Sequence, residues 1–208
     1  MGGCTYSDLT TISLEQSESL GDVPGPLPVI CSDLIVDVVQ VARAKAAGAE
    51  AVSIQWDVVG GEMTSTFTSA AHALGMEVVV EVSTVEGIKG AISGGAEIVL
   101  LNTPQEDIET KIEWRKEHVP DGVTAICAIA AADDKALGEV EDAWRLRDGG
   151  FQGVWVSDCL FKAGADPTEH AGAIINAMKS KSSVKFASPR SKSGRGEGAR
   201  EYLGDILM

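Results

Sequence analysis

The chain has 208 residues, of which 44% are hydrophobic and 5% aromatic, and it contains 23 glycines. Its 17 Lys and Arg against 31 Asp and Glu give a net charge of −14 at pH 7, which argues against binding to nucleic acid or to an anionic membrane surface. No apolar run approaches the roughly 20 residues that span a bilayer, and the length suits one core, so a single soluble domain over residues 1–208 is predicted.

The charge is unevenly distributed along the chain. Residues 1–178 hold 10 Lys and Arg against 28 Asp and Glu, a balance of −18, whereas residues 179–208 hold 7 against 3, a balance of +4. The acidic part is interpreted as a solvated surface. The basic segment is expected either to fold onto its own acidic body or to dock on an acidic partner.

The cysteines and histidines give no pattern typical of a metal site. The four cysteines, Cys4, Cys31, Cys127 and Cys159, have no C-x-x-C spacing, and the three histidines are isolated from one another. Free thiols in a reducing compartment, the cytoplasm or the plastid stroma, are therefore predicted, with no metal and no cofactor.

Six short apolar runs follow one another from Leu27 onward. They cover residues 27–31, 51–56, 77–83, 97–102, 123–130 and 153–158. Continuous apolar runs of this length are typical of strands in a parallel sheet that is buried on both faces.

Helical patterns separate these runs. They cover residues 37–47, 61–75, 84–94, 105–118, 133–148 and 167–178, and several end in a glycine suited to a left-handed cap, as in "AAGAE", "ALGME" and "SGGAE". The alternation predicts a parallel α/β domain. An open doubly wound sheet and a closed (βα)8 barrel both fit, although no G-x-G-x-x-G follows the early strands and the barrel needs two more strands.

Two long stretches carry a resemblance to a known family. "LPVICSDLIVDVVQVARAKAAGAEAV" and "ALGMEVVVEVSTVEGIKGAISGGAEIVLLN" resemble corresponding stretches of indole-3-glycerol-phosphate synthase, a (βα)8 TIM barrel of tryptophan biosynthesis. Residues 27–178 are similar to the third to eighth units of that barrel. The resemblance implies the TIM-barrel fold.

The first strand of that family resembles a segment at the other end of this chain. The family pattern "E-x-K-x-(A/S)-S-P-S-x-G" is similar to "SVKFASPRSKSG", which begins at Ser183. The resemblance implies a circularly permuted barrel in which residues 183–207 supply the first strand and helix, residues 6–14 supply the second strand, and "GDVPGPLP" reduces the second helix to a short connection. The alternative is that a Ser-, Lys- and Arg-rich tail matches the motif by chance.

The family's reaction decarboxylates 1-(2-carboxyphenylamino)-1-deoxyribulose 5-phosphate and closes a ring. It calls for a cationic lysine as general acid, a carboxylate opposite it, and backbone donors around the phosphate. By resemblance, the chain keeps three catalytic positions, at Glu81, Asn102 and Lys185. They are expected to be inactive remnants, because other positions are lost.

The lost positions include the general acid. Ser32 stands in "CSDL" where the family has the lysine of "K-D-F", and a hydroxyl cannot replace an ammonium as a proton donor. The first-strand glutamate becomes Ser183. Ala128 and Ile129 occupy the place of "E-S" in the family's "E-S-G".

The phosphate site is degenerate by the same comparison. The glycine of the family's last strand becomes Ser157, and Asp158 follows it where an anion should bind. A carboxylate at that place opposes phosphate binding. Trp56 and Trp155 replace smaller residues, and each is expected either to fill the old pocket or to pack between strand and helix.

Two functions follow from this sequence. The favoured one is a degenerate barrel, a pseudoenzyme that acts as a structural or interaction subunit of a larger protein assembly, with no small-molecule substrate. The alternative is an enzyme, either a residual synthase or a barrel that uses Glu81, Asn102 and Lys185 on a substrate without phosphate. Fold alone does not decide between them.

Overall fold

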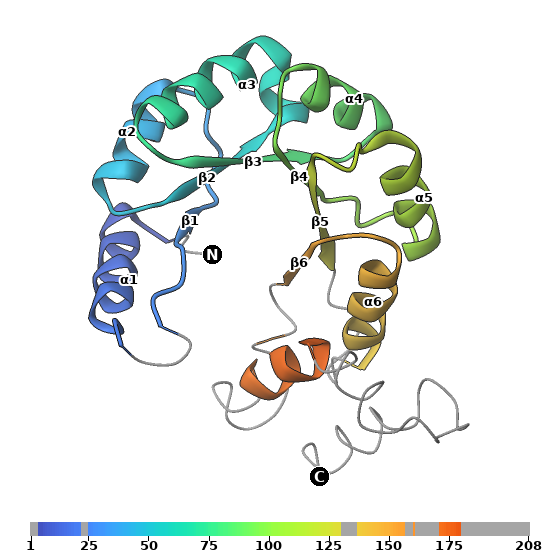
Figure 1. The fold of residues 1–208 in the computed structure, drawn as a ribbon. Helices are drawn as coiled ribbons and strands as arrows, with labels where there is room; N and C mark the ends of the chain where they lie inside the picture. Colours follow the sequence, from blue (N-terminus) through green and yellow to red (C-terminus); the bar gives the residue numbers. More distant parts are fainter. Residues whose placement is uncertain (1–3, 22–24, 130–136, 157–159, 161–170, 180–208) are drawn as a thin grey trace. The chain divides into compact units, whose positions relative to one another are not determined.

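The computed structural model describes residues 4–21, 25–129, 137–156, 160 and 171–179. The chain divides into two compact units, Met1–Leu101 with His118–Thr124, and Asn102–Glu117 with Ala125–Met208. Each unit contains parallel strands that alternate with helices (Figure 1). The predicted parallel α/β architecture is confirmed.

The first unit contains four parallel strands whose spatial order is their order in the chain. They are β1 (Ile30–Cys31), β2 (Ala51–Gln55), β3 (Glu77–Val82) and β4 (Ile98–Leu101). The helices α2 (Val38–Ala46), α3 (Trp56–Ala73) and α4 (Val85–Ser93) connect them. These elements match four of the predicted strands, although the first is shorter than expected.

The core of this unit is the apolar sheet and the helices packed on it. Val52, Ile54 and Val80 are at most 1% exposed, as expected for strands covered on both faces. Phe67 of α3 and Ile88 of α4 are also fully buried. This packing holds the carboxyl ends of the strands in place.

Local capping residues determine where the helices begin and end. The Asp37 side chain accepts a 2.8 Å hydrogen bond from Val39 N at the start of α2, and Thr84 Oγ1 accepts one of 3.0 Å from Gly87 N in α4. Gly48, just after α2, has a φ of +94°, which a residue with a Cβ rarely adopts. The predicted glycine turn after this helix is confirmed.

The second unit contains most of α5 (Ile108–His118) and β5 (Thr124–Ile129), together with α6 (Leu137–Asp148), β6 (Gly153–Val156) and a helical stretch over 171–179. β5 and β6 are parallel, with Ile126 opposite Gly153. Trp144 Nε1 in α6 donates a 3.0 Å hydrogen bond to Ala177 O. This bond joins α6 to the helical stretch that follows β6.

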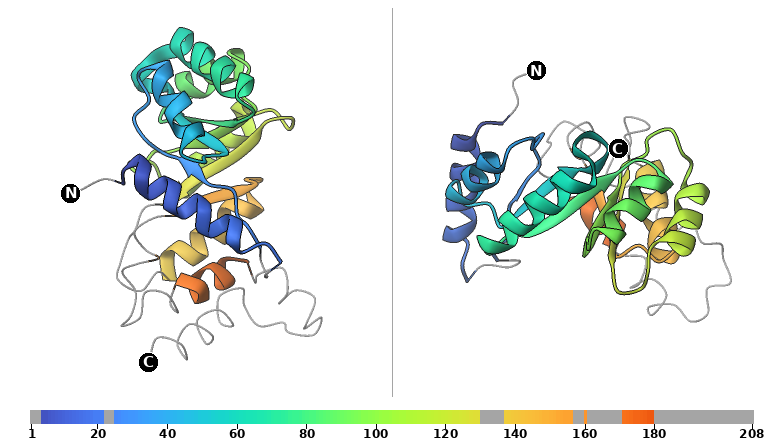
Figure 2. Two further views of the ribbon diagram at one scale, coloured as in Figure 1. Left: turned by 90° about the vertical axis from the view of Figure 1, so that its left-hand side faces the viewer. Right: turned by 90° about the horizontal axis from the view of Figure 1, so that it is seen from above.

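One prediction about the start of the chain is wrong. Residues 6–14 do not form the predicted strand and instead lie in helix α1 (Tyr6–Glu18), beside α2 and the segment that leads into β1 (Figure 2). Thr5 and Asp8 form a capping box, in which Thr5 N donates to Asp8 Oδ2 at 2.7 Å. Thr10 and Thr11 donate to carbonyls four residues earlier, which satisfies their hydroxyls within a helix.

The remaining part of the permutation hypothesis falls on residues 183–207, which lie outside the described residues. The segment that the hypothesis requires as the second strand is the helix α1. Permutation therefore has no support in the described part of the chain.

Candidate functional site

Three polar side chains meet near the carboxyl ends of β2 and β3 in the first unit. Ser53 Oγ and Gln55 Nε2 each donate a 3.4 Å hydrogen bond to Glu81 Oε2. Ser53 is fully buried, and Gln55 lies directly opposite Glu81 in the parallel register. Both of these donors are neutral, so they orient the Glu81 carboxylate without supplying a readily transferable proton.

A second carboxylate stabilises the loop beside this cluster. Asp57, in the first turn of α3, accepts a 2.7 Å hydrogen bond from Ser83 N just beyond β3. A backbone N–H that donates to a carboxylate makes a strong, charge-assisted contact. Asp57 thereby ties the start of α3 to the loop that leads into α4.

The strand ends of this unit are acidic in their local sequence. The stretches 30–42, 51–62 and 77–86 contain β1, β2 and β3 with the residues that follow each strand, and none contains Lys or Arg. The first two contain Asp33 and Asp57, and the third contains Glu81. This residue set disfavours an anionic ligand.

Trp56 packs between two helices. A Cβ added at Gly90 of α4 would lie 2.8 Å from Trp56 Cε2, so the indole ring lies directly against that glycine. Trp56 Nε1 is buried and has no hydrogen-bond partner among the described residues. Trp56 thus has a packing role, but its ring lies against the helix α4 and not between a strand and a helix as expected. Trp155 is half-buried in β6, where it lies opposite Ala128 of β5.

The described positions of the predicted site are spread over both units. Ser32 is exposed just after β1, and Glu81 is half-buried in β3. Asn102 is exposed directly after β4, and Ala128 and Ile129 lie in β5. The remaining positions, Ser157, Asp158, Ser183 and Lys185, lie outside the described residues.

Ser53 and Gln55 are not among the predicted site residues. Their signal is visible in "AVSIQW", where polar residues stand two apart in an apolar strand. Residues two apart lie on one face of a strand, so this alternation marks a polar face. The family resemblance points to charged positions and does not include these two neutral side chains.

Within the described ranges, no three His, Cys, Asp or Glu side chains are grouped so that they could hold a metal ion. None of the described helices is both long and apolar enough to cross a membrane.

Comparison with known proteins gives one family. The model of the family described as indole-3-glycerol phosphate synthase matches residues 22–165. Among similar proteins, the indole-3-glycerol phosphate synthase of Leptospira interrogans is 38% identical over 95 residues, which are 45% of this chain and 37% of that protein. The synthase of Carboxydothermus hydrogenoformans is 25% identical over 138 residues, 66% of this chain and 52% of that protein.

The tryptophan biosynthesis protein TrpCF of Yersinia pestis is 32% identical over 103 residues, which are 48% of this chain and 22% of that protein. The chain thus spans about half or less of the length of each of these three relatives.

Two solved structures share the fold at low sequence identity. A cube-shaped, highly porous protein cage designed by fusing symmetric oligomeric domains has a TM-score of 0.62 at 14% identity, over 96% of this chain and 68% of that one. A structure described as native KDPGal has a TM-score of 0.61 at 13% identity, over 86% and 77% of the two chains. These likenesses concern the fold alone.

Proposed function

Because this chain belongs to the indole-3-glycerol phosphate synthase family, with the TIM-barrel type of fold, we propose that it is a catalytically degenerate member of that family. In this proposal it no longer converts the synthase substrate and serves as an interaction subunit of a larger protein assembly. The proposal concerns this chain, which covers only part of its relatives.

One observation carries the proposal: the ends of β1, β2 and β3 carry carboxylates and no Lys or Arg in their local sequence. Position 32, where the family has its general-acid lysine, is an exposed serine beside Asp33. A serine cannot protonate the carbonyl and the departing hydroxyl as a lysine ammonium does.

Electrostatics supports the same proposal. The substrate of the synthase carries a carboxylate and a phosphate, both negative at pH 7. At an effective dielectric of about 20, each protein carboxylate within about 8 Å opposes an approaching unit negative charge by about 2 kcal/mol. Carboxylates such as Asp33 and Asp57 therefore weaken the binding of an anionic substrate near these strand ends.

Substitutions at four other family positions also support the proposal. Ala128 and Ile129 lack the carboxylate and hydroxyl of the family motif, and Ser157 and Asp158 replace the phosphate-binding glycine and its neighbour. In this proposal the family-like residues Asn102 and Lys185 are remnants that persist without a substrate to act on.

An assay for indoleglycerol phosphate by its fluorescence tests the loss of activity. The natural chain is expected to give no turnover above a blank without protein. The Leptospira interrogans synthase under the same conditions is the positive control. Measurable turnover by the natural chain would defeat this part of the proposal.

The interaction role is tested separately by the size of the native protein. The proposal expects the protein, isolated from its natural source without denaturant, to elute in an assembly larger than the 21.7 kDa chain. Elution only as a free monomer would contradict the interaction role, whatever the activity assay gives.

A second candidate is that the chain is a residual synthase. The match to the family model over residues 22–165, together with Glu81 and Asn102 at family positions, favours it. The turnover assay distinguishes the two candidates, because only the second expects product.

A further inference from the structure

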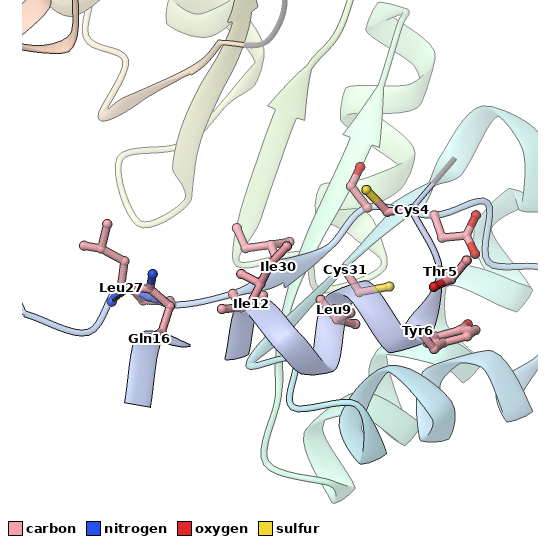
Figure 3. A pocket seen from close by; sticks show the side chains of 13 residues that line it. Cys4, Thr5, Tyr6, Leu9, Ile12, Gln16, Leu27, Ile30 and Cys31 are labelled. Carbon is pink, nitrogen blue, oxygen red and sulfur yellow. Dashed lines mark hydrogen bonds between the residues drawn. The ribbon is translucent and has the colours of Figure 1, made fainter. Parts of the chain in front are cut away.

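A pocket of about 880 Å³ lies between α1 and the segment 27–33 that contains β1 (Figure 3). Its apolar walls come from both elements, with Leu9 and Ile12 on α1 and Ile30 on β1. Leu27 lies near Gln16 at one end. Ser32, a predicted site position, also lines the pocket, whereas none of the lining residues belongs to the cluster around Glu81.

Helix α1, which forms one wall of the pocket, is held in place by hydrogen bonds although it stays accessible to solvent. No residue of α1 is buried. Ser13 Oγ donates to Gly48 O at 3.1 Å, and Gln16 Oε1 accepts from Leu27 N at 2.8 Å. A further contact places the Arg43 guanidinium 5.9 Å from the centroid of the Tyr6 ring. The wall is positioned while much of its apolar surface is left uncovered.

Exposed apolar side chains concentrate in this part of the chain. Of the twelve large hydrophobic side chains that are exposed among the described residues, eight fall between residues 12 and 39. They are Ile12, Leu14, Leu20, Leu27, Leu34, Val36, Val38 and Val39. Two of the eight, Ile12 and Leu27, line the pocket, and exposed apolar side chains at a pocket are typical of a surface that another protein segment covers.

The loop after β1 is held in place by the side chain of Gln40. Its Oε1 accepts from Val36 N at 2.8 Å and from Asp37 N at 3.0 Å, and its Nε2 donates to Leu34 O at 3.0 Å. Leu34 is 50% exposed and Val36 is 54% exposed on this loop. A preorganised apolar loop loses little entropy when a partner binds it.

The charge around the pocket indicates which kind of segment it would bind. The described residues between 4 and 42 include five Asp and Glu and no Lys or Arg, and Arg43 lies over the ring of Tyr6, which lines the pocket. Asp33 lines the pocket itself. A segment with both basic and apolar side chains is complementary to such a surface.

We propose that this pocket binds the segment 181–195 of a second copy of the chain. That segment has five Lys and Arg and no Asp or Glu, and it contains Val184 and Phe186 two residues apart. The apolar pair fills the pocket, and the basic side chains meet the acidic surface around it. The inference rests on the proposed interaction role and deepens it by naming the partner segment.

The segment belongs to the second unit of the chain and the pocket to the first. A contact between copies therefore joins two different surfaces. Because the segment and the pocket are different surfaces, each copy gives its segment to one neighbour and receives a segment from another. Such head-to-tail contacts produce closed rings or open chains of copies.

Disulfide trapping between two complementary variants tests this contact. One variant keeps Cys4 and Phe186, and the other carries C4S and F186C, both in a C159S background. A bond between residues 4 and 186 can then form only between two copies. We expect a covalent dimer under mild oxidation, with the 4–186 peptide pair identified by mass spectrometry.

A matched control places the new cysteine at Ser193 instead of Phe186, and it is expected to give less of the dimer. Absence of the 4–186 link, while circular dichroism shows that both variants are folded, would overturn the proposal. In a third variant that carries both Cys4 and F186C, a link that forms within one chain, with none between the two complementary variants, would overturn it as well.

Sedimentation velocity of the unmodified chain gives a second measurement. We expect association that grows with protein concentration and weakens with added salt, because the Debye length falls to about 3 Å at 1 M. Asp33→Asn should weaken association about two- to fivefold, as for an exposed ion pair. Glu77→Gln, at an exposed residue outside the pocket, is its matched control.

A chain that stays monomeric at all concentrations would contradict the inference. The proposed loss of synthase activity is judged by turnover alone, and the wider interaction role by the size of the native assembly. Failure of the contact between copies is therefore distinguishable from failure of either part of the proposed function.

Discussion

Gln55 and Glu81 are direct register partners on the neighbouring parallel strands β2 and β3, and Gln55 Nε2 donates a 3.4 Å hydrogen bond to Glu81 Oε2. The buried Ser53 hydroxyl donates to the same oxygen. An amide and a hydroxyl orient a carboxylate but are poor general acids at neutral pH. The two donors therefore fix the orientation of the Glu81 carboxylate in the sheet.

Restoring the general acid alone should yield little synthase activity. Ser32→Lys supplies a cationic proton donor, but general acid catalysis, typically worth about 10²–10⁴-fold, acts only on a correctly placed substrate. If Ser157 and Asp158 take the places of the family's phosphate-binding residues, as the resemblance implies, the phosphate would still meet a carboxylate there. The fluorescence assay should find no more than marginal turnover in this variant.

The matched variant combines Ser32→Lys with Ser157→Gly and Asp158→Ser, which returns the phosphate site toward the family pattern. Turnover is expected to be higher in the triple variant than in the single one. Full activity from Ser32→Lys alone would show that the phosphate site is intact and that this reasoning is wrong.

The contact between Trp56 and Gly90 should make a small substitution costly. In Gly90→Ala, the new Cβ would overlap the indole ring, and overpacking of this kind typically costs about 1–3 kcal/mol of unfolding free energy. Gly61→Ala is the control, because its Cβ would lie 3.9 Å from Trp56 Nε1, an ordinary contact, and alanine favours a helix. Urea unfolding measures both, and equal stability of the two variants would contradict the prediction.

Replacing Gly48 with alanine should destabilise the packing of α1 against the turn after α2. Gly48→Ala adds the cost of a positive φ, roughly 1–2 kcal/mol, to a clash of the new Cβ with the Ser13 side chain. Gly75→Ala is the control, since Gly75 also has a positive φ but an added Cβ there meets no atom within 4 Å. Thermal unfolding should show a larger loss of stability for Gly48→Ala, and an equal loss in both would remove the clash argument.

Cys127 should resist alkylation until the chain unfolds. Burial raises the pKa of its thiol to about 11, so the thiol stays protonated at pH 8, and its side chain is not exposed. Cys4 is exposed and should react first with iodoacetamide. Peptide mass spectrometry after a timed reaction checks the order, and modification of Cys127 at the same rate as Cys4 in folded protein would refute it.

The raised pKa of Cys127 also predicts how the stability of the chain changes with pH. The pKa of Cys127 is higher in the folded chain than the ordinary value of 9.0, so the folded state favours the protonated thiol. Its contribution to stability is full below pH 9 and is lost as the pH rises toward 11. Cys127→Ala should therefore show a shallower loss of unfolding free energy across this pH range than the natural chain.

The sequence by itself determined the alternation of strands and helices, because each strand is a short apolar run and several helices carry their own capping residues. The run "EVVVEVS" has the pattern of a buried parallel strand before any partner is known, and β3 lies within it. Asp37 and Thr84 cap their helices through contacts two or three residues away. Such short-range features can be predicted from sequence.

Only the tertiary structure decided which side chains meet across the sheet and which structure the start of the chain adopts. Ser53 and Glu81 are 28 residues apart in sequence and meet because β2 and β3 pair in one particular register. The Thr-rich stretch 6–14 suits a strand by composition, but α1 is held by its capping box and by the bond from Ser13 to Gly48, 35 residues away. Pairing and packing of distant segments select between local alternatives whose intrinsic preferences differ by only about 1 kcal/mol.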